Sequence, residues 1–301
     1  MRICVAATPK VALPTLEYLR LSEHELVSVI TQPDRPAGRG QKSRESDVSE
    51  WALRNGIHCA KPESEEETLR ALAGADLLLT IGYGVILPLK VISAPSHGSI
   101  NLHFSLLPRW RGAAPVQRAI EAGDSVSGVT VFALDEGMDT GPIYLEKRFA
   151  LDADITSDEL LNELSELGVE AVTETLELID KGVRPRTQSV EGATRAFKIS
   201  KEEAEVDWSQ SAPVISQKIR AFTSSPGAWT IFRGSTVKIF TPLISELELE
   251  PGQILIQDKK LFIGTATFAL EIGGVQPSGK AAMAASSWVN GVRLATGERF
   301  G

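Results

Sequence analysis

The chain has 301 residues, 43% of them hydrophobic, and a formal net charge of −8. This length can bury two modest hydrophobic cores, and the acidic balance excludes a protein that coats nucleic acid through overall positive charge. The charge is uneven, because residues 206–301 carry nine Lys or Arg against seven Asp or Glu. Any binding of a polyanion would therefore depend on local basic patches.

The N-terminus and the apolar runs predict a protein without a membrane anchor. The first ten residues read as a strand broken by Pro9, and they lack the pattern of a signal peptide. The longest uncharged apolar stretch, Leu77–Leu89, is interrupted by two glycines and a proline and is too short to span a bilayer. Cys4 and Cys59 have no metal-type spacing, and Cys4 lies in an apolar strand pattern that predicts a buried thiol, so we expect a reducing compartment. We expect a cytoplasmic protein with no bound metal.

The first half of the chain alternates short apolar runs with helical patterns. The predicted strands are Arg2–Ala6, Glu25–Thr31, Asp76–Ile81, Ser99–His103 and Ser127–Phe132. The predicted helices are Pro14–Leu21, Ser46–Asn55 and Ala113–Ala122. This alternation favours an α/β fold with a Rossmann-like, mostly parallel sheet covered on both faces. Such sheets bind ligands beyond the carboxyl ends of their strands.

The second half predicts a different architecture. A long amphipathic helix is expected at Ser157–Lys181, with Ser157 as N-cap and Gly182 as stop. After a helix near Ala212–Phe222, short β-rich runs suggest a small closed or nearly closed barrel. These runs are Ala228–Arg233, Thr236–Phe240, Gln253–Ile256, Lys260–Gly264 and Phe268–Ile272. The predicted domains are 1–182, a linker at 183–205, and 206–301.

An amide and an imidazole stand two residues apart in N-L-H, at the end of a predicted strand. Because side chains of an extended chain repeat their direction every second residue, Asn101 and His103 should point the same way. Together they can hold a carbonyl oxygen as it becomes an oxyanion. By itself, such a pair is more often structural, with the asparagine capping a turn and the histidine half-buried.

A carboxylate follows in D-E-G-M-D-T-G-P, at residues 135–142, on a turn after another predicted strand. Asp139 within reach of His103 would favour the charged imidazolium and fix its orientation. The glycines around Asp139 would allow close backbone approach to a ligand. Read alone, an aspartate in a Gly/Pro turn is ordinarily a turn former.

Four basic residues lie within ten positions that contain no acid. They are Arg35, Arg39, Lys42 and Arg44. A proline and two glycines between them disfavour regular structure, so we expect an irregular basic loop on an acidic domain. Such a segment suits phosphate contact and ordering on binding.

These motifs together resemble one family. N-x-H-x-S-L-L-P, then R-G and A-A-P, then G-M-D-T-G-P are similar to the 10-formyltetrahydrofolate-dependent formyltransferases. R-W-R-G-A-A-P-V-Q at 109–117 and Q-P-D-R-P-A-G-R-G-Q-K at 32–42 resemble the methionyl-tRNA formyltransferase branch. Later segments agree, including K-I-S-K-E-E-A-E-V-D-W, I-R-A-F, P-G-A-W and Q-P-S-G-K-A-A-M. The resemblance spans essentially the whole chain.

The resemblance implies transfer of a formyl group from 10-formyltetrahydrofolate to the α-amine of methionine on initiator tRNA, without a metal. Asn101, His103 and Asp139 would surround the transferred group. Asn101 and a protonated His103 held by Asp139 would stabilise the oxyanion, and Asp139 would relay protons. The implied folate contacts are Gly84, Val85, Ile86, Leu87, Ser105, Leu106, Leu107, Pro108, Glu136, Gly137, Met138 and Thr140.

The remaining implications concern tRNA and assembly. The basic segment with Arg35, Arg39, Lys42 and Arg44 corresponds to the loop that enters the acceptor stem, and the C-terminal OB-like barrel contributes to tRNA binding. We expect a monomer with no obligate protein partner, although the sequence itself leaves the oligomeric state open. The chain departs from the family pattern at four places, which are Ala7 for glycine, Val11 for an aromatic residue, Phe104 for a small residue, and Ser224-Ser225 for P-W. None of them is one of the three polar groups.

Three alternatives are weighed against this interpretation. A sugar-nucleotide formyltransferase would use the same chemistry on a different amine, but the basic loop and the barrel favour tRNA. A non-catalytic RNA-binding protein on this scaffold would need a broken polar triad, which is intact. A dinucleotide-dependent oxidoreductase is disfavoured, since A-A-T-P follows the first strand where G-x-G-x-x-G would be needed.

Overall fold

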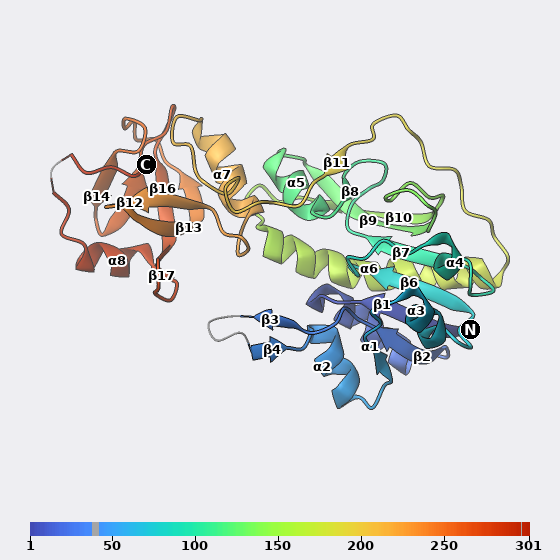
Figure 1. Ribbon diagram of the computed structural model, residues 1–301. Helices are drawn as coiled ribbons and strands as arrows, with labels where there is room; N and C mark the ends of the chain where they lie inside the picture. The colour runs from blue at the N-terminus through green and yellow to red at the C-terminus, as the bar shows by residue number, and fades with distance from the viewer. Residues whose placement is uncertain (38–41, 296) are drawn as a thin grey trace. The chain divides into compact units, whose positions relative to one another are not determined.

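The computed structural model describes residues 1–37, 42–295 and 297–301, and the chain forms two compact units (Figure 1). The first unit comprises Met1–Pro115, Val126–Ala150 and Leu161–Ala196. The second comprises Val116–Ser125, Leu151–Leu160 and Phe197–Gly301. The predicted α/β class is confirmed, with a mostly parallel sheet in the first unit and a curled antiparallel sheet in the second. Residues 183–196 of the predicted linker belong to the first unit.

The first unit is built on a seven-stranded sheet in the order β10-β9-β7-β6-β1-β2-β5. Its strands are β1 Arg2–Ala7, β2 Glu25–Ile30, β5 Cys59–Ala60, β6 Leu77–Ile81, β7 Ser99–His103, β9 Val126–Ala133 and β10 Ile143–Ala150. Five adjacent strands of the sheet run parallel to one another, namely β5, β2, β1, β6 and β7. By contrast, β9 runs antiparallel to β7, and β10 runs antiparallel to β9. Every expected strand of this half is present, and the edge strands β5 and β10 were not predicted.

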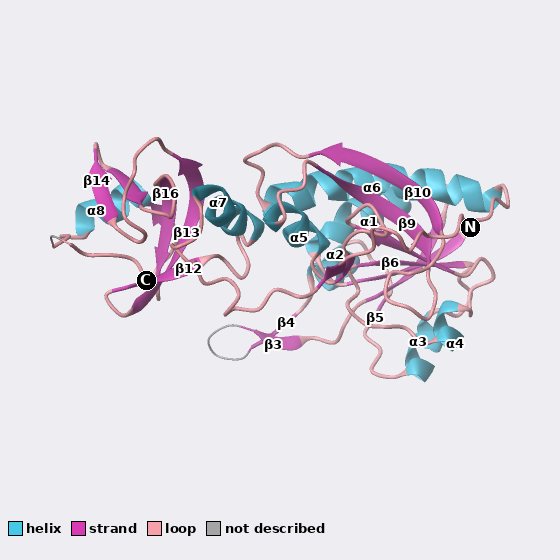
Figure 2. Cartoon of the chain, turned by 90° about the horizontal axis from the view of Figure 1, so that it is seen from above, coloured by secondary structure: helices cyan, strands magenta, loops and turns pink. Residues whose placement is uncertain are grey.

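Helices cover both faces of this sheet, as Figure 2 shows for α6 and α1 on one side and α3 and α4 on the other. They are α1 Leu13–Leu21, α2 Asp47–Arg54, α3 Glu65–Ala71, α4 Leu89–Ile92 and α6 Ser157–Asp180, with a 3-10 turn at Lys10–Ala12. Gly168 on α6 lies against Leu102, because an added Cβ there would come 2.7 Å from the leucine side chain. Leu102 faces α6, so its strand neighbours Asn101 and His103 face the side of α3 and α4.

The predicted cap of the long helix is wrong by one residue. The Thr156 hydroxyl accepts from the Glu159 N–H at 3.4 Å, and the Glu159 carboxylate accepts from the Thr156 N–H at 2.9 Å. This reciprocal pair is a capping box. Ser157 instead donates its hydroxyl to the carbonyl of Thr223.

The second unit is a curled antiparallel sheet packed on two helices. The strand order is β12-β13-β16-β15-β14, with β17 paired to β16. The elements are α7 Ala212–Ala221, β12 Trp229–Phe232, β13 Ser235–Ile244, β14 Ile254–Gln257, β15 Lys260–Ile263, β16 Leu270–Pro277, β17 Met283–Ala284 and α8 Ala285–Gly291. Among the described residues no ladder joins β12 to β14, so the predicted barrel is a half-barrel rather than a closed one.

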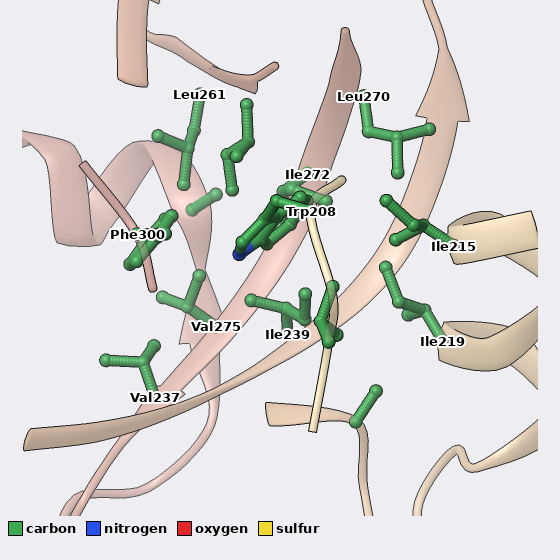
Figure 3. Packing of buried hydrophobic residues seen from close by; sticks show 14 of the residues in the cluster. Trp208, Ile215, Ile219, Val237, Ile239, Leu261, Leu270, Ile272, Val275 and Phe300 are labelled. Carbon is green, nitrogen blue, oxygen red and sulfur yellow. The ribbon is translucent and has the colours of Figure 1, made fainter. Parts of the chain in front are cut away.

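Aromatic and aliphatic side chains fill the concave side of this sheet. In Figure 3, Ile215 and Ile219 from α7 point toward the same core as Ile239 and Val275 from the strands. Phe300 lies at the centre of an aromatic cluster. Its ring centroid is 5.4 Å from Phe232, 5.9 Å from Trp288 and 6.2 Å from Trp208.

Two short ribbons complete the fold. β3 Arg35–Ala37 pairs antiparallel with β4 Lys42–Arg44, and β8 Arg111–Gly112 pairs in parallel with β11 Arg195–Ala196. In the part of the chain that the structure describes, no helix has the length and apolarity needed to cross a membrane.

Candidate active site

A cavity of about 460 Å³ opens on the face of the first sheet opposite α6. Its floor is formed by β6 and β7, and its walls by the turn after β6 and the turn after β9. Asn101, His103 and Asp139 all line it, so the structure brings the three predicted polar groups together. Its remaining lining residues are Thr80, Gly82, Tyr83, Gly84, Val85, Ile86, Leu87, Ile92, Leu102, Phe104, Gly112, Ala113, Pro115, Leu134, Asp135, Gly137 and Met138.

Asn101 is held by its register partner on β6. The Asn101 Nδ2 donates to Thr80 Oγ1 at 2.7 Å, and the Thr80 hydroxyl donates to the Ile100 carbonyl at 3.3 Å. Because the hydroxyl proton is used on that carbonyl, Thr80 must accept from the amide, which fixes the nitrogen on this side. A side-chain amide has two N–H groups, so one remains to donate toward the cavity.

His103 is buried, at 6% exposure, and its orientation is set by a backbone carbonyl. Its Nε2 donates to the carbonyl of Trp110 at 2.9 Å. A carbonyl can only accept, so this nitrogen carries the proton and Nδ1 is the ring nitrogen that faces Asp139. The distance from Nδ1 to Asp139 Oδ2 is 3.8 Å, beyond a hydrogen bond. The hydrogen bond that orients the imidazole is thus the one to the Trp110 carbonyl, and orientation by Asp139 stays a prediction.

Asp139 reaches His103 from an unexpected direction. Because β9 runs antiparallel to β7, the turn after it starts beside the amino end of β7, where the Leu134 N–H donates to the Ser99 carbonyl at 2.8 Å. The turn must then run back along the sheet face to bring Asp139 to His103. There the Asp139 Oδ2 accepts from the Gly112 N–H at 2.7 Å. The predicted site at a carboxyl edge is thus completed by a segment from the opposite edge.

The glycines near Asp139 are explained by contacts within the chain. A Cβ on Gly141 would lie 1.8 Å from the carbonyl oxygen of Ala133, and a Cβ on Gly112 would lie 2.6 Å from that of Ala196. Both positions exclude a side chain because neighbouring backbone fills the space. For Gly141, close packing of the Ala133 backbone therefore explains the glycine, rather than the expected approach of a ligand.

The predicted folate residues divide into two groups. Gly84, Val85, Ile86, Leu87, Gly137 and Met138 line the cavity. Ser105, Leu106, Leu107, Pro108, Glu136 and Thr140 lie outside its lining. The Ser105 hydroxyl donates to the Arg109 carbonyl at 2.7 Å, and the Thr140 hydroxyl donates to Asp135 at 2.8 Å, so these two side chains brace the turns. Direct folate contact from the second group stays a prediction.

The basic segment is more regular than expected. The structure pairs Arg35 with Arg44 and Ala37 with Lys42 in a two-stranded hairpin, and Arg39 lies outside the described residues. The base of the hairpin is tied by Lys61, whose Nζ lies 2.7 Å from Asp34 and 3.9 Å from Glu45. The expectation of an irregular segment is wrong at both described strands, because antiparallel pairing uses their backbone groups.

Sequence reasoning missed Thr80, Gly112 and Gln188. Thr80 was read only as part of an apolar strand, although its position opposite Asn101 follows from the strand register. Gln188 lies in the predicted linker, where aperiodic sequence gave no reason to expect burial; it is 7% exposed. Gly112 was quoted within a motif, but nothing in the sequence links its N–H to Asp139.

Ionisable groups beneath the cavity are kept neutral. Burial raises the pKa of the Cys4 thiol to about 12, and burial together with Cys4 raises the pKa of the Tyr83 hydroxyl. Tyr83 packs its ring into the core beside Cys4 and presents its backbone to the cavity. Neither group titrates near neutral pH. Among the described residues, no three His, Cys, Asp or Glu side chains cluster in a way that could hold a metal ion.

Two of the departures from the family pattern are located by the structure. Phe104 is buried and lines this cavity, whereas Val11 lines a separate hollow of about 600 Å³ bordered by α1, α2 and α6. The missing aromatic at position 11 therefore changes the second hollow rather than the walls around Asn101.

Comparison with known proteins identifies the family to which this fold belongs. Residues 1–176 match the family model described as formyl transferase, and residues 198–293 match the formyl transferase C-terminal domain. The chain belongs to the formyl transferase family. Within it, the chain is 42% identical over 306 residues to methionyl-tRNA formyltransferase of Salinispora arenicola, covering 99% of each chain. It is 41% identical over 309 residues to the Thermobifida fusca enzyme, covering 100% of this chain and 99% of the other.

Solved structures show the same fold at lower identity. HypX from Aquifex aeolicus, in complex with tetrahydrofolic acid, has a TM-score of 0.69 at 23% identity, over 96% of this chain and 47% of that one. An N-formyltransferase from Helicobacter canadensis, in complex with folinic acid and dTDP-3-aminofucose, has a TM-score of 0.68 at 19% identity. That match covers 92% of this chain and 99% of the other.

Proposed function

We propose that this chain transfers the formyl group of 10-formyltetrahydrofolate to the α-amine of methionine on initiator tRNA. The observation that carries the proposal is the convergence of Asn101, His103 and Asp139 on one cavity. Methionyl-tRNA formyltransferases more than 40% identical over nearly the whole chain support the choice of acceptor. The donor carries its formyl group on N10 and delivers it to the attacking amine.

The cavity fits a flat, mostly apolar donor. Val85, Ile86 and Met138 line it, yet they remain 49%, 76% and 45% exposed. Side chains of this kind at a cavity mouth are buried when a ring system binds between them. Backbone groups of the Gly82–Gly84 turn can pair with the polar edge of a pterin without committing a side chain.

Asn101 supplies the oxyanion donor. As the amine attacks, negative charge grows on the formyl oxygen, and the Nδ2–H that is not bound to Thr80 can donate to it. The hydrogen bond with Thr80 fixes the amide before substrate arrives, so little reorganisation is needed during reaction. A donor that is already oriented is worth about 10²–10³ in rate.

His103 and Asp139 present two acceptors to one gap. In the neutral imidazole with its proton on Nε2, Nδ1 accepts, and it lies 3.8 Å from Asp139 Oδ2. An amine nitrogen can lie within about 2.7–3.2 Å of both atoms. One of them takes a proton from the amine as the new C–N bond forms. That proton is then passed to N10 as the old C–N bond breaks, so no net proton is gained or lost.

The β3–β4 hairpin suits the tRNA phosphates. Its register pairs Arg35 with Arg44 and Ala37 with Lys42, so the two strands gather three basic residues in one ribbon. Basic residues gathered in this way suit a phosphate backbone, which releases counterions when they bind it. We assign the first unit, including residues 183–196, to catalysis and residues 206–301 of the second unit to tRNA binding, in a cytoplasmic monomer that uses no metal.

The test is formyl transfer from labelled 10-formyltetrahydrofolate by the purified chain. Methionyl-initiator tRNA should be formylated, elongator methionyl-tRNA should be a poor acceptor, and KM for tRNA should rise with salt. Absence of transfer to initiator tRNA would refute the proposal. Efficient transfer to a nucleotide-linked amino sugar, without tRNA affinity, would favour the alternative acceptor.

A further inference from the structure

Gln188 is a buried polar side chain whose neighbours on both sides in the chain are exposed. It lies in the segment 186–196, which we term the strap, and it is 7% exposed while Thr187 and Ser189 are exposed. Burying an amide is unfavourable unless its donors and acceptor are all paired. Its burial therefore indicates a set of specific partners rather than apolar packing.

The amide of Gln188 is fully committed. Its Nε2 donates to the carbonyl of Asp139 at 3.1 Å and to the carbonyl of Gly141 at 2.9 Å. Its Oε1 accepts from the Arg111 guanidinium, from Nε at 2.8 Å and from a terminal nitrogen. Two carbonyls on one side and a cation on the other admit only one orientation of the amide.

These contacts close a ring around the candidate site. Gln188 binds the backbone of Asp139, and the carboxylate of Asp139 accepts from the Gly112 N–H. Gly112 follows Arg111 in the chain, and Arg111 binds Gln188. The ring thus couples the turn that carries Asp139 to the loop whose Trp110 carbonyl orients His103.

The strap contacts the two strained residues of the site. Asp139 has a φ of 55° and Trp110 a φ of 64°, both in the left-handed region that favours glycine. Gln188 binds the Asp139 carbonyl, and the Thr194 hydroxyl accepts from the Trp110 N–H at 2.9 Å. Strain of this kind persists only where surrounding contacts hold it.

We propose that Gln188 is a positioning residue for formyl transfer, holding the Asp139 carboxylate at its place opposite His103. This inference rests on the proposed function for its kinetic consequence. Its structural consequence does not depend on activity, since Gly112 keeps its N–H bonded only while the Asp139 carboxylate stays in place.

Two variants separate the donors of Gln188 from its acceptor. Gln188→Glu keeps an oxygen for Arg111 and removes both donors, while Gln188→Met removes the whole amide at similar size. Val190→Ala is the matched control, because Val190 lies in the same strap and is 84% exposed. If one Gln188 variant fails to fold, the other still gives both readouts.

The readouts are kcat, the two KM values and amide hydrogen exchange at Gly112. We expect both Gln188 variants to lose at least tenfold in kcat with both KM values within twofold, and Gly112 exchange to quicken about tenfold. The Arg111 amide, which donates to the Thr194 carbonyl at 2.9 Å, should stay protected, and Val190→Ala should match wild type.

Each outcome decides the proposal. An unchanged kcat, or unchanged Gly112 exchange, overturns it. A fall in kcat accompanied by equal rises in KM and loss of Arg111 protection shows general loosening and also overturns it. If the wild-type chain does not formylate tRNA, the proposed function fails, and Gly112 exchange alone still decides whether Gln188 positions Asp139.

Discussion

The candidate active site of the first unit and the aromatic cluster of the second are both enclosed, yet different interactions hold them. Asn101, His103 and Asp139 are placed by directed hydrogen bonds at 2.7, 2.9 and 2.7 Å. Trp288 and Phe300, by contrast, are held by ring contacts, and their own centroids lie 5.9 Å apart. Hydrogen bonds fix direction and contribute little net stability, whereas buried rings dominate stability and specify direction loosely. Substitutions in the candidate active site should therefore be followed by reaction rate, and those in the aromatic cluster by stability.

The largest effect on stability is expected in the aromatic cluster. Trp288→Ala removes a side chain that is 7% exposed and packs against Phe232 and Phe300. The cavity left behind should lower the free energy of unfolding by about 3–5 kcal/mol. Chemical denaturation followed by circular dichroism measures this. Val214→Ala, at a position 47% exposed, is the control and should change it by less than about 0.5 kcal/mol.

The next effect should appear mainly in rate. Asn101→Ala removes the proposed oxyanion donor, so kcat should fall by about 10²–10³. The lost hydrogen bond to Thr80 should cost only about 0.5–1.5 kcal/mol of stability. Steady-state formylation and denaturation of the same preparation give both numbers. A stability loss as large as that of Trp288→Ala would break the proposed contrast between the two regions.

A smaller rate effect tests whether orientation itself matters. Thr80→Val has the same shape but lacks the hydroxyl that accepts from Asn101. The amide then loses its anchor, and we expect kcat to fall about tenfold, since one neutral hydrogen bond is worth about 0.5–1.5 kcal/mol. Thr80→Ser restores the hydroxyl and should recover most of the rate. Equal activity of the Val and Ser variants would show that this hydrogen bond does not position Asn101.

The smallest effect concerns a partly buried ion pair of the second unit. The Arg118 guanidinium, 2.5 Å from Glu203, holds the pKa of that carboxyl below its ordinary value of 4.5. The pair thus stabilises the fold above pH 4.5, and this contribution is lost as pH falls through the lower folded pKa. Glu203→Gln should lower stability by at most about 1 kcal/mol at pH 7 and by nothing at the acid end. A pH series of denaturation midpoints checks the sign, and an equal loss at every pH would contradict it.

The sequence predicted those parts of the site that depend on local patterns. Asn101 and His103 share a face because strand side chains alternate, and that period is visible in the sequence. The apolar runs likewise predicted β1, β2, β6 and β7 to within one or two residues. The half-buried edge strand β10 carries no such run, so it was missed.

What the sequence could not predict depends on long-range contacts. The Trp110 carbonyl that orients His103 and the Gly112 N–H that binds Asp139 are backbone groups, which every residue has, so no residue type marks them. Gln188 meets Asp139 across 49 residues of chain, and its segment has no periodicity. The antiparallel course of β9 likewise follows from pairing that the apolar pattern does not encode.

The most direct test of the account is the single-turnover rate of His103→Ala, measured with saturating 10-formyltetrahydrofolate and methionyl-initiator tRNA. Single turnover isolates the chemical step from product release. If His103 Nδ1 and Asp139 hold the attacking amine, the rate should fall at least 10²-fold while folding, by circular dichroism, stays that of the wild type. A rate within a fewfold of wild type would contradict the assignment of this cavity as the active site.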